Sequence, residues 1–350
     1  MKPNLFDFAT SELSQDAMIC WLLAWADPSG KLEDQKLHGL GVSVLAAVFS
    51  KFGRSVPVVR QVVKVHRQER HIDVIVLIDD WAVLCIEDKA GTTEHSDQLR
   101  RYREYTEQKY PGREIFPVYV QTSDQSSYQA VTQAGYVVLH RRELIDLLND
   151  YKNLQGSNAI ALDFLAYLSS IESAVESYSR CPISTWTDSS LVGFYAKLAC
   201  DLQGAEWGYV ANPRGGFIGL WWGWRCVGDC SLYAQLEPSY TECAHGYSVD
   251  ALQLTFRIAV NDSADARDAR IFWHQRVVDS ARTMGVSVTK PKRFGTGSTM
   301  TVAVLAEDPR RTNECGVIDY PVTLENIRAA ADLIATAAKH AEQEHASDPR

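Results

Sequence analysis

The sequence predicts an α/β domain with an αβββαβ core, in which helices flank a mixed sheet, followed by an α+β domain. Three observations support this expectation. The chain has 350 residues, about twice the length of an average domain. The apolar periodicity of its first part follows the order helix, three strands, helix, strand. Beyond Pro182 the sequence changes to Gly- and Trp-rich strand patterns. We therefore expect a first domain over residues 1–155, a helical connector over 156–182 and a second domain over 183–345.

The first predicted element is a helix. Apolar residues are dense over 17–26, and Ser14, Gln15 and Asp16 before them suit a helix cap and a first turn. Because this helix is apolar all round, we expect it to be buried. The sequence DPSG over 27–30 ends it, and a second helix is expected over 38–52.

Strands and helices alternate through the rest of the first domain. Strands are expected where β-branched residues alternate with other residues, and helices where the apolar residues have the helical period. The expected strands are 56–66, 71–78, 81–89, 115–121 and 136–139, and the expected helices are 95–109, 127–133 and 141–151. The connector is an amphipathic helix in which Phe164, Leu168, Ile171, Val175 and Tyr178 recur at spacings of three and four.

The second domain is expected to contain strands first and helices later. Within its Trp-rich strand, alternation places Trp222 and Trp224 on one face and Trp221 on the other. That pair of rings either packs in the core or, if exposed, stacks on bases. The expected strands are 207–211, 217–224, 232–236, 251–260 and 299–305, and the expected helices are 266–284 and 324–340.

The composition limits the class of protein. There are 35 Lys and Arg residues against 44 Asp and Glu, a formal charge of −9, which excludes a generally basic nucleic-acid binder. Any nucleic-acid contact must therefore be a local patch. The longest apolar run, over 17–26, is shorter than the roughly 20 residues of a membrane span, so no membrane partner is expected. Eight scattered cysteines and an N-terminus without a signal segment favour the cytoplasm.

Two expected strands of the first domain carry a cluster of ionisable residues. Asp73 lies in one strand, and Glu87-Asp88-Lys89 closes the next. Since side chains alternate along a strand, Glu87 and Lys89 share a face while Asp88 points the other way. Buried carboxylates are costly unless something compensates their charge. A divalent metal ion held by Asp73 and Glu87 would compensate it, with Lys89 close enough to position or deprotonate a water molecule.

The connection between these two strands tests that interpretation. A two-residue hairpin at Asp79 and Asp80 would place Asp73 and Glu87 on opposite sides of the sheet. The metal site requires a register shifted by one residue, so we predict either a three-residue loop over 79–81 or a bulge. Asp73 and Glu87 would then be direct cross-strand neighbours, with Cβ atoms about 4.5–5.5 Å apart.

This arrangement resembles the PD-(D/E)xK nuclease superfamily. Asp73, thirteen intervening residues and Glu87-Asp88-Lys89 match its motif, with Ile72 in the place of the eponymous proline. Gln98 and Tyr102, four residues apart on one face of the following helix, resemble the QxxxY motif of its exonuclease-like branch.

The resemblance extends to the N-terminal segment and covers roughly residues 5–150. Glu12 resembles the N-terminal glutamate that approaches the metal in many members. The run ELSQD over 12–16 and the run HGLG over 38–41 look like the N-terminal block of a bacterial family in this superfamily. The αβββαβ order of the superfamily core matches the order expected from the periodicity alone.

The resemblance implies a nuclease that hydrolyses phosphodiester bonds with Mg²⁺, for which Mn²⁺ can substitute. Asp73 and Glu87 would hold the ion with the main-chain carbonyl of Asp88, and Lys89 would align the attacking water. Glu12 would orient a water or bind a second ion. The implied catalytic residues are Asp73, Glu87, Lys89, Glu12, Gln98 and Tyr102. DNA is the expected polymer ahead of RNA, antiviral defence is the expected context, and a homodimer or a defence-system partner protein is a further expectation.

Two clusters of basic residues are candidates for contact with phosphates. Arg100 and Arg101 follow Gln98 on its helix, and Lys290, Lys292 and Arg293 lie in a Gly-containing loop of the second domain. The alternative for each cluster is a charged surface that contacts only solvent.

Other interpretations of the site also stay open. Asp73, Glu87 and Lys89 could form a structural ion-pair cluster, and Glu12 could be an ordinary carboxylate at a helix start. At the level of the whole protein, the chain could be a weakly active binding module or a subunit of a larger defence or restriction complex.

Overall fold

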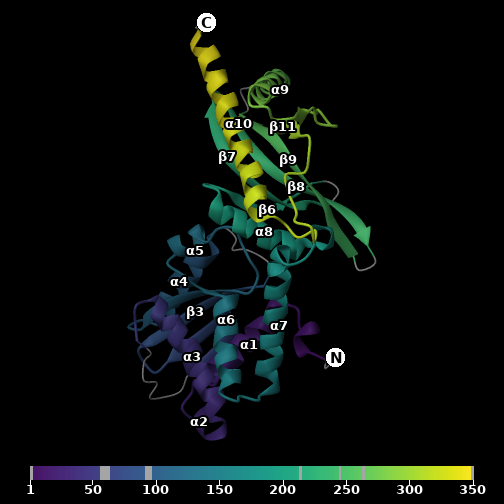
Figure 1. Cartoon of the computed structure of the whole chain (residues 1–350). Helices are drawn as coiled ribbons and strands as arrows, with labels where there is room; N and C mark the ends of the chain where they lie inside the picture. Colours follow the sequence, from purple (N-terminus) through teal and green to yellow (C-terminus); the bar gives the residue numbers. More distant parts are fainter. Residues whose placement is uncertain are drawn as a thin grey trace. The chain divides into compact units, whose positions relative to one another are not determined.

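The computed structural model describes residues 3–55, 64–90, 97–212, 215–243, 246–261 and 265–347. It divides into two compact units, residues 1–173 and 174–350, which are described separately (Figure 1). Across these described ranges, no helix is long and apolar enough to cross a membrane.

A mixed five-stranded sheet forms the centre of the first unit, with the order β1-β2-β3-β4-β5. The first three strands are antiparallel neighbours, whereas β4 and β5 run parallel to β3. This is the mixed sheet predicted from the sequence. Its strands are β1 Lys64–Glu69, β2 Ile72–Ile78, β3 Ala82–Lys89, β4 Glu114–Gln121 and β5 Val137–His140. The predicted strand over 56–66 has residues 56–63 outside the described part of the chain.

Helices cover both faces of this sheet, so β3 is buried along its whole length. One apolar cluster joins one face to α1, α3, α6 and α7, and a second joins the other face to α4 and α5 (Figure 1). The helices are α1 Glu12–Ala24, α2 Gly30–Glu33, α3 Gln35–Lys51, α4 Gln98–Lys109, α5 Gln129–Gln133, α6 Arg141–Asn153 and α7 Ala159–Glu176. His95 and Ser96, the expected start of α4, lie outside the described residues.

The first helix differs from its prediction in two ways. It begins at Glu12, because the Ser11 hydroxyl caps it by accepting a hydrogen bond from the Ser14 amide. It is also not buried all round, because Ala17 and Ala24 are exposed and Trp21 is half-buried. Its inner face nevertheless anchors the unit, and polar side chains of that same face reach the end of β3.

The second unit is built on a six-stranded antiparallel sheet with the order β10-β11-β9-β8-β7-β6. Three helices join one face of it in a single apolar core. Its elements are α8 Asp188–Asp201, β6 Glu206–Val210, β7 Phe217–Val227, β8 Cys230–Cys243, β9 Gly246–Val260, α9 Ala266–Thr283, β10 Val288–Thr289, β11 Thr299–Leu305 and α10 Tyr320–Ser347. Helix α8 and the short strand β10 were not predicted, and β8 and β9 are longer than expected.

The predicted arrangement of the three tryptophans in β7 is wrong. The pairing of β7 with β8 is irregular between Trp222 and Arg225, and Gly223 has a φ of +73°. This bulge breaks the alternation, so Trp222 is buried in the core and Trp224 is exposed. The Trp224 ring stacks on Tyr233, with ring centroids 4.0 Å apart.

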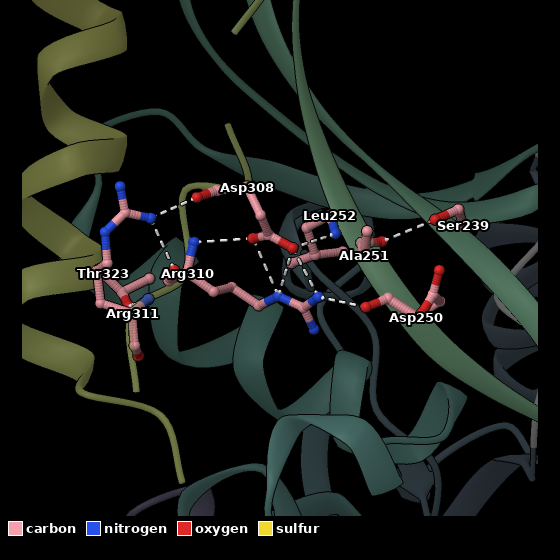
Figure 2. A network of polar contacts seen from close by, with 8 residues as sticks. All are labelled: Ser239, Asp250, Ala251, Leu252, Asp308, Arg310, Arg311 and Thr323. Atoms are coloured by element: carbon pink, nitrogen blue, oxygen red, sulfur yellow. Dashed lines mark hydrogen bonds and ion pairs between the residues drawn. The ribbon is translucent and has the colours of Figure 1, made fainter. Parts of the chain in front are cut away.

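A buried arginine ties the segment after β11 to β9 (Figure 2). Arg310 forms an ion pair with Asp308, at 2.7 Å, and donates to the main-chain carbonyl of Asp250. Asp308 in turn accepts a hydrogen bond from the Leu252 amide. The two hydrogen bonds to Asp250 and Leu252 hold the segment that leads to α10 against β9.

Candidate active site

The β2–β3 hairpin has the register that the metal site requires. Ile78 is paired with Ala82 and Val74 with Ile86, so Asp79, Asp80 and Trp81 form the connection. The predicted three-residue loop is confirmed. Asp79 adopts a φ of +48°, a left-handed conformation that Asp tolerates better than most residues.

The hairpin brings Asp73 and Glu87 to the same face of the sheet, the face toward α4. One step beyond the Val74–Ile86 pair, the register sets them opposite each other. Asp73 Oδ2 accepts a hydrogen bond of 2.9 Å from the main-chain amide of Asp88. Burial raises the pKa of Glu87, and the nearby charge of Asp73 raises it further.

Three further predicted residues converge on the Glu87 carboxylate. Lys89 Nζ donates to Glu87 Oε1 at 2.5 Å, and Gln98 Nε2 donates to the same oxygen at 2.8 Å. Gln98 also contacts the Tyr102 hydroxyl at 3.1 Å, as expected for two residues one helical turn apart. Strands β2 and β3 and helix α4 therefore assemble one polar cluster.

Asp88 points to the opposite face, toward α1. Its Oδ1 accepts a hydrogen bond of 2.5 Å from Gln15 Nε2, and Gln15 Oε1 accepts one of 2.6 Å from the Thr122 hydroxyl. Glu12 reaches the end of β3, where its Oε1 accepts a bond of 3.4 Å from the Ala90 amide. Helix α1 is thus fastened to the end of the strand that carries the cluster.

Sequence reasoning missed two residues that join this cluster. Gln68 Nε2 donates to Asp16 Oδ2 at 2.9 Å and to Asp73 Oδ1 at 3.2 Å. The spacing of Glu12 and Asp16 puts both carboxylates on one face of α1, a signal that could have indicated Asp16. No comparable signal exists for Gln68, which lies at a break in the β1–β2 pairing with a φ of +57°.

Burial and mutual repulsion shift the acids of the site toward their protonated forms. The pKa of Glu87 is raised to about 8 by burial and by the charge of Asp73, although Lys89 opposes the shift. Burial and Asp73 likewise raise the pKa of Asp16 to about 6. Burial raises the pKa of Asp88 well above its ordinary value. For Lys89, burial lowers the pKa, but the hydrogen bond and charge of Glu87 outweigh it and raise the pKa overall.

A comparison with protein families shows which family the chain belongs to. The family model described as PD-(D/E)XK nuclease superfamily matches residues 3–177, half of the chain. The chain belongs to the PD-(D/E)XK nuclease superfamily. The match spans all of the elements that carry the polar cluster. Neither the comparison with curated proteins nor that with solved structures gives a match.

Membership in this superfamily indicates a nuclease and a nucleic-acid substrate. It also raises the question of whether the residues present fit a divalent ion. Within the described ranges, Glu87 Oε2 is buried without a hydrogen-bond partner, as are Oδ2 of Asp88 and Oδ1 of Asp16. A buried pair of repelling carboxylates with an unsatisfied oxygen is the donor set that a hard cation such as Mg²⁺ prefers.

The side-chain ligands for such an ion would be two rather than three. In the described part of the chain, no group of three or more His, Cys, Asp or Glu side chains is arranged to hold a metal. Mg²⁺ commonly binds through one or two carboxylates and keeps several waters. Asp73 and Glu87 therefore fit an ion whose other ligands are main-chain oxygen and water.

The basic residues of α4 are less favourably placed than predicted. Arg100 forms an ion pair with Asp97, the residue that precedes α4, and one of 3.1 Å with Glu104 on the same helix. Arg101 is exposed on the same helix. Arg100 would have to leave both carboxylates to bind a phosphate, so its position agrees better with the solvated surface named as the alternative.

The raised pKa of Glu87 predicts how stability depends on pH. The folded protein holds this proton up to about pH 8, whereas an unfolded chain releases it near pH 4.5, so the folded state binds more protons between these values. The free energy of unfolding in EDTA therefore falls as the pH rises from about 5 to 8. Thermal melts of the wild type and Glu87→Gln at several pH values test this prediction. The variant should lack the decrease in stability that Glu87 causes between about pH 5 and 8. Equal pH dependence of the two proteins would contradict the assignment.

Proposed function

We propose that the protein is a Mg²⁺-dependent nuclease that hydrolyses phosphodiester bonds in DNA. The observation that carries the proposal is the convergence of Asp73, Glu87, Lys89 and Gln98 on one face of the β2–β3 hairpin, within the segment that matches the nuclease superfamily.

Asp73 and Glu87 would hold the ion, with the main-chain carbonyl of Asp88 as a further ligand. When bound, the ion neutralises charge that develops on the phosphate and stabilises the leaving oxygen. Its charge would also compensate the repulsion between the two carboxylates that now raises the pKa of Glu87.

Lys89 would position the attacking water and stabilise charge next to it. Its ammonium group donates to Glu87, and its raised pKa keeps it protonated at neutral pH. In that state Lys89 is a hydrogen-bond donor and not a base, so its role is orientation and charge stabilisation.

The surrounding amides would hold the ligands in place. Gln98 fixes the Glu87 carboxylate, and Tyr102 supports Gln98. Gln15 holds the side chain of Asp88, whose main-chain amide holds Asp73. Glu12 at the start of α1 would orient a water or bind a second ion.

Incubation of the purified protein with linear DNA, circular DNA and RNA, in Mg²⁺, Mn²⁺ or EDTA, tests the proposal. We expect DNA to be degraded with Mg²⁺ or Mn²⁺ and to stay intact in EDTA. Loss of the circular form identifies an endonuclease, and degradation of linear DNA alone identifies an exonuclease. Cleavage that persists in EDTA, or no cleavage of either polymer, contradicts the proposal.

We propose antiviral defence in the bacterial cytoplasm as the context, on the family resemblance of the N-terminal block. A neighbouring gene for a helicase, a methyltransferase or a signal synthase would support it and would also supply the expected partner protein. A protein that binds nucleic acid without turnover is the alternative outcome, which the absence of Mg²⁺ and Mn²⁺ binding would favour.

A further inference from the structure

Two basic residues of the second unit lie over one aromatic ring, and two more precede that ring in the same loop. Phe294, in the loop between β10 and β11, has the Arg270 guanidinium 4.1 Å and the Lys290 ammonium 4.6 Å from its ring centroid. Arg270 also donates to the main-chain carbonyl of Phe294. Lys292 and Arg293 precede this ring in the loop, and both are exposed. We call Arg270, Lys290, Lys292 and Arg293 the basic cluster.

The second unit is otherwise acidic. Residues 174–350 contain 17 Lys and Arg against 21 Asp and Glu. Other arginines of this unit are neutralised by acidic neighbours, such as Arg257 by Glu237 and Arg310 by Asp308. The salt bridges among the described residues include none made by the four members of the basic cluster.

The ion pairs among the described residues include none between Arg270 and a carboxylate. Asp265 caps α9, where its Oδ1 accepts hydrogen bonds from the amides of Arg267 and Asp268. Arg270 Nε is buried and has no hydrogen-bond partner among the residues that the structure describes. Because Arg270 and Lys290 lie over the same ring and like charges repel one another, an anion from outside the chain would stabilise the basic cluster.

We propose that the basic cluster binds the phosphate backbone of the nucleic-acid substrate. This inference rests on the proposed nuclease function, because the substrate of a nuclease is nucleic acid, which is a polyanion. The arrangement favours phosphate over base recognition, because two cations already lie over the Phe294 ring, where a base would otherwise stack. Binding is therefore independent of base sequence and strongly dependent on salt.

Fluorescence anisotropy with a labelled DNA duplex tests the proposal. The full-length protein is measured in EDTA, which prevents cleavage, at several salt concentrations. We expect Lys292→Glu/Arg293→Glu to bind the duplex at least about tenfold more weakly than the wild type. The slope of log Kd against log salt concentration should be smaller by about two. The matched control is Lys197→Glu/Arg282→Glu, which makes the same charge change at exposed cations of this unit that already pair with Asp201 and Asp279.

The outcomes separate this inference from the proposed nuclease function. If Lys292→Glu/Arg293→Glu binds DNA as tightly as the wild type, the basic cluster is not a DNA site, even if the wild type cleaves DNA. Weakened binding by the cluster variant alone supports it, even if the wild type proves inactive as a nuclease. Equal weakening of both double variants also overturns it, because that result reflects net charge alone.

Discussion

We expect Asp73→Asn, Glu87→Gln and Lys89→Met each to reduce the proposed Mg²⁺-dependent cleavage by about 10²- to 10⁴-fold. The first two variants remove charge from the proposed ligands of the ion, and the third removes the cation next to them. All three side chains belong to one cluster, in which Lys89 contacts Glu87 at 2.5 Å. Initial rates on a labelled DNA substrate at saturating Mg²⁺ measure the loss.

Two controls show that such a loss is chemical and not structural. Glu104→Gln neutralises an exposed carboxylate on α4 and should keep wild-type activity. Glu87→Gln should melt at a temperature no lower than the wild type in EDTA at pH 8, because it removes a buried charge that repels Asp73. A folded variant of Asp73, Glu87 or Lys89 with full activity would show that the active site lies elsewhere.

Gly41→Ala is expected to destabilise the first unit by about 1–3 kcal/mol. A Cβ atom at Gly41 would lie 2.6 Å from the Ala26 amide nitrogen and 2.7 Å from the Leu22 carbonyl oxygen. Both are main-chain atoms, so α3 can accept the methyl group only by moving away from the end of α1. Because α1 carries Glu12 and Gln15, cleavage should fall together with stability.

The same helix supplies the matched control. A Cβ atom at Gly39 would meet nothing within 4 Å. Gly39→Ala should therefore raise the free energy of unfolding by about 0.5–1 kcal/mol through helix propensity alone. Urea unfolding followed by circular dichroism gives both values. Equal effects at Gly39 and Gly41 would mean that α1 and α3 do not pack this closely.

The order of elements in the first unit could be predicted because it depends on local periodicity. The strands β2 and β3 are short apolar runs. The requirement that Asp73 and Glu87 share a face predicted either a three-residue loop or a bulge, and the structure has the loop. The same reasoning failed for β7, because the alternation rule holds only without a bulge. Gly223, with its positive φ, reverses the faces of the residues after it.

Helix α8 shows how tertiary packing decides what local sequence does not. Leu191, Phe194, Tyr195 and Leu198 have the helical period and are buried, but Gly193 weakens the local helix propensity. A Cβ atom at Gly193 would lie 2.0 Å from the main-chain oxygen of Val175. Only glycine therefore allows α8 to pack this closely against Val175. That contact is invisible in the sequence.

The polar network around the site was predictable only in part. Asp73, Glu87, Lys89 and Gln98 follow a known spacing, whereas Gln68 reaches Asp16 and Asp73 from a position where the chain has a left-handed conformation. Such conformations are uncommon for residues other than glycine and concentrate at functional sites. The sequence carries no local signal that would place a glutamine side chain there.

Titration calorimetry with Mn²⁺ tests most directly whether Asp73 and Glu87 form the metal site of a nuclease. We expect the wild type to bind Mn²⁺, the double variant Asp73→Asn/Glu87→Gln to lose that binding, and Lys89→Met to keep it while cleavage is lost. Mn²⁺ binding of equal affinity by the wild type and the double variant would contradict the assignment of these two carboxylates as the ligands.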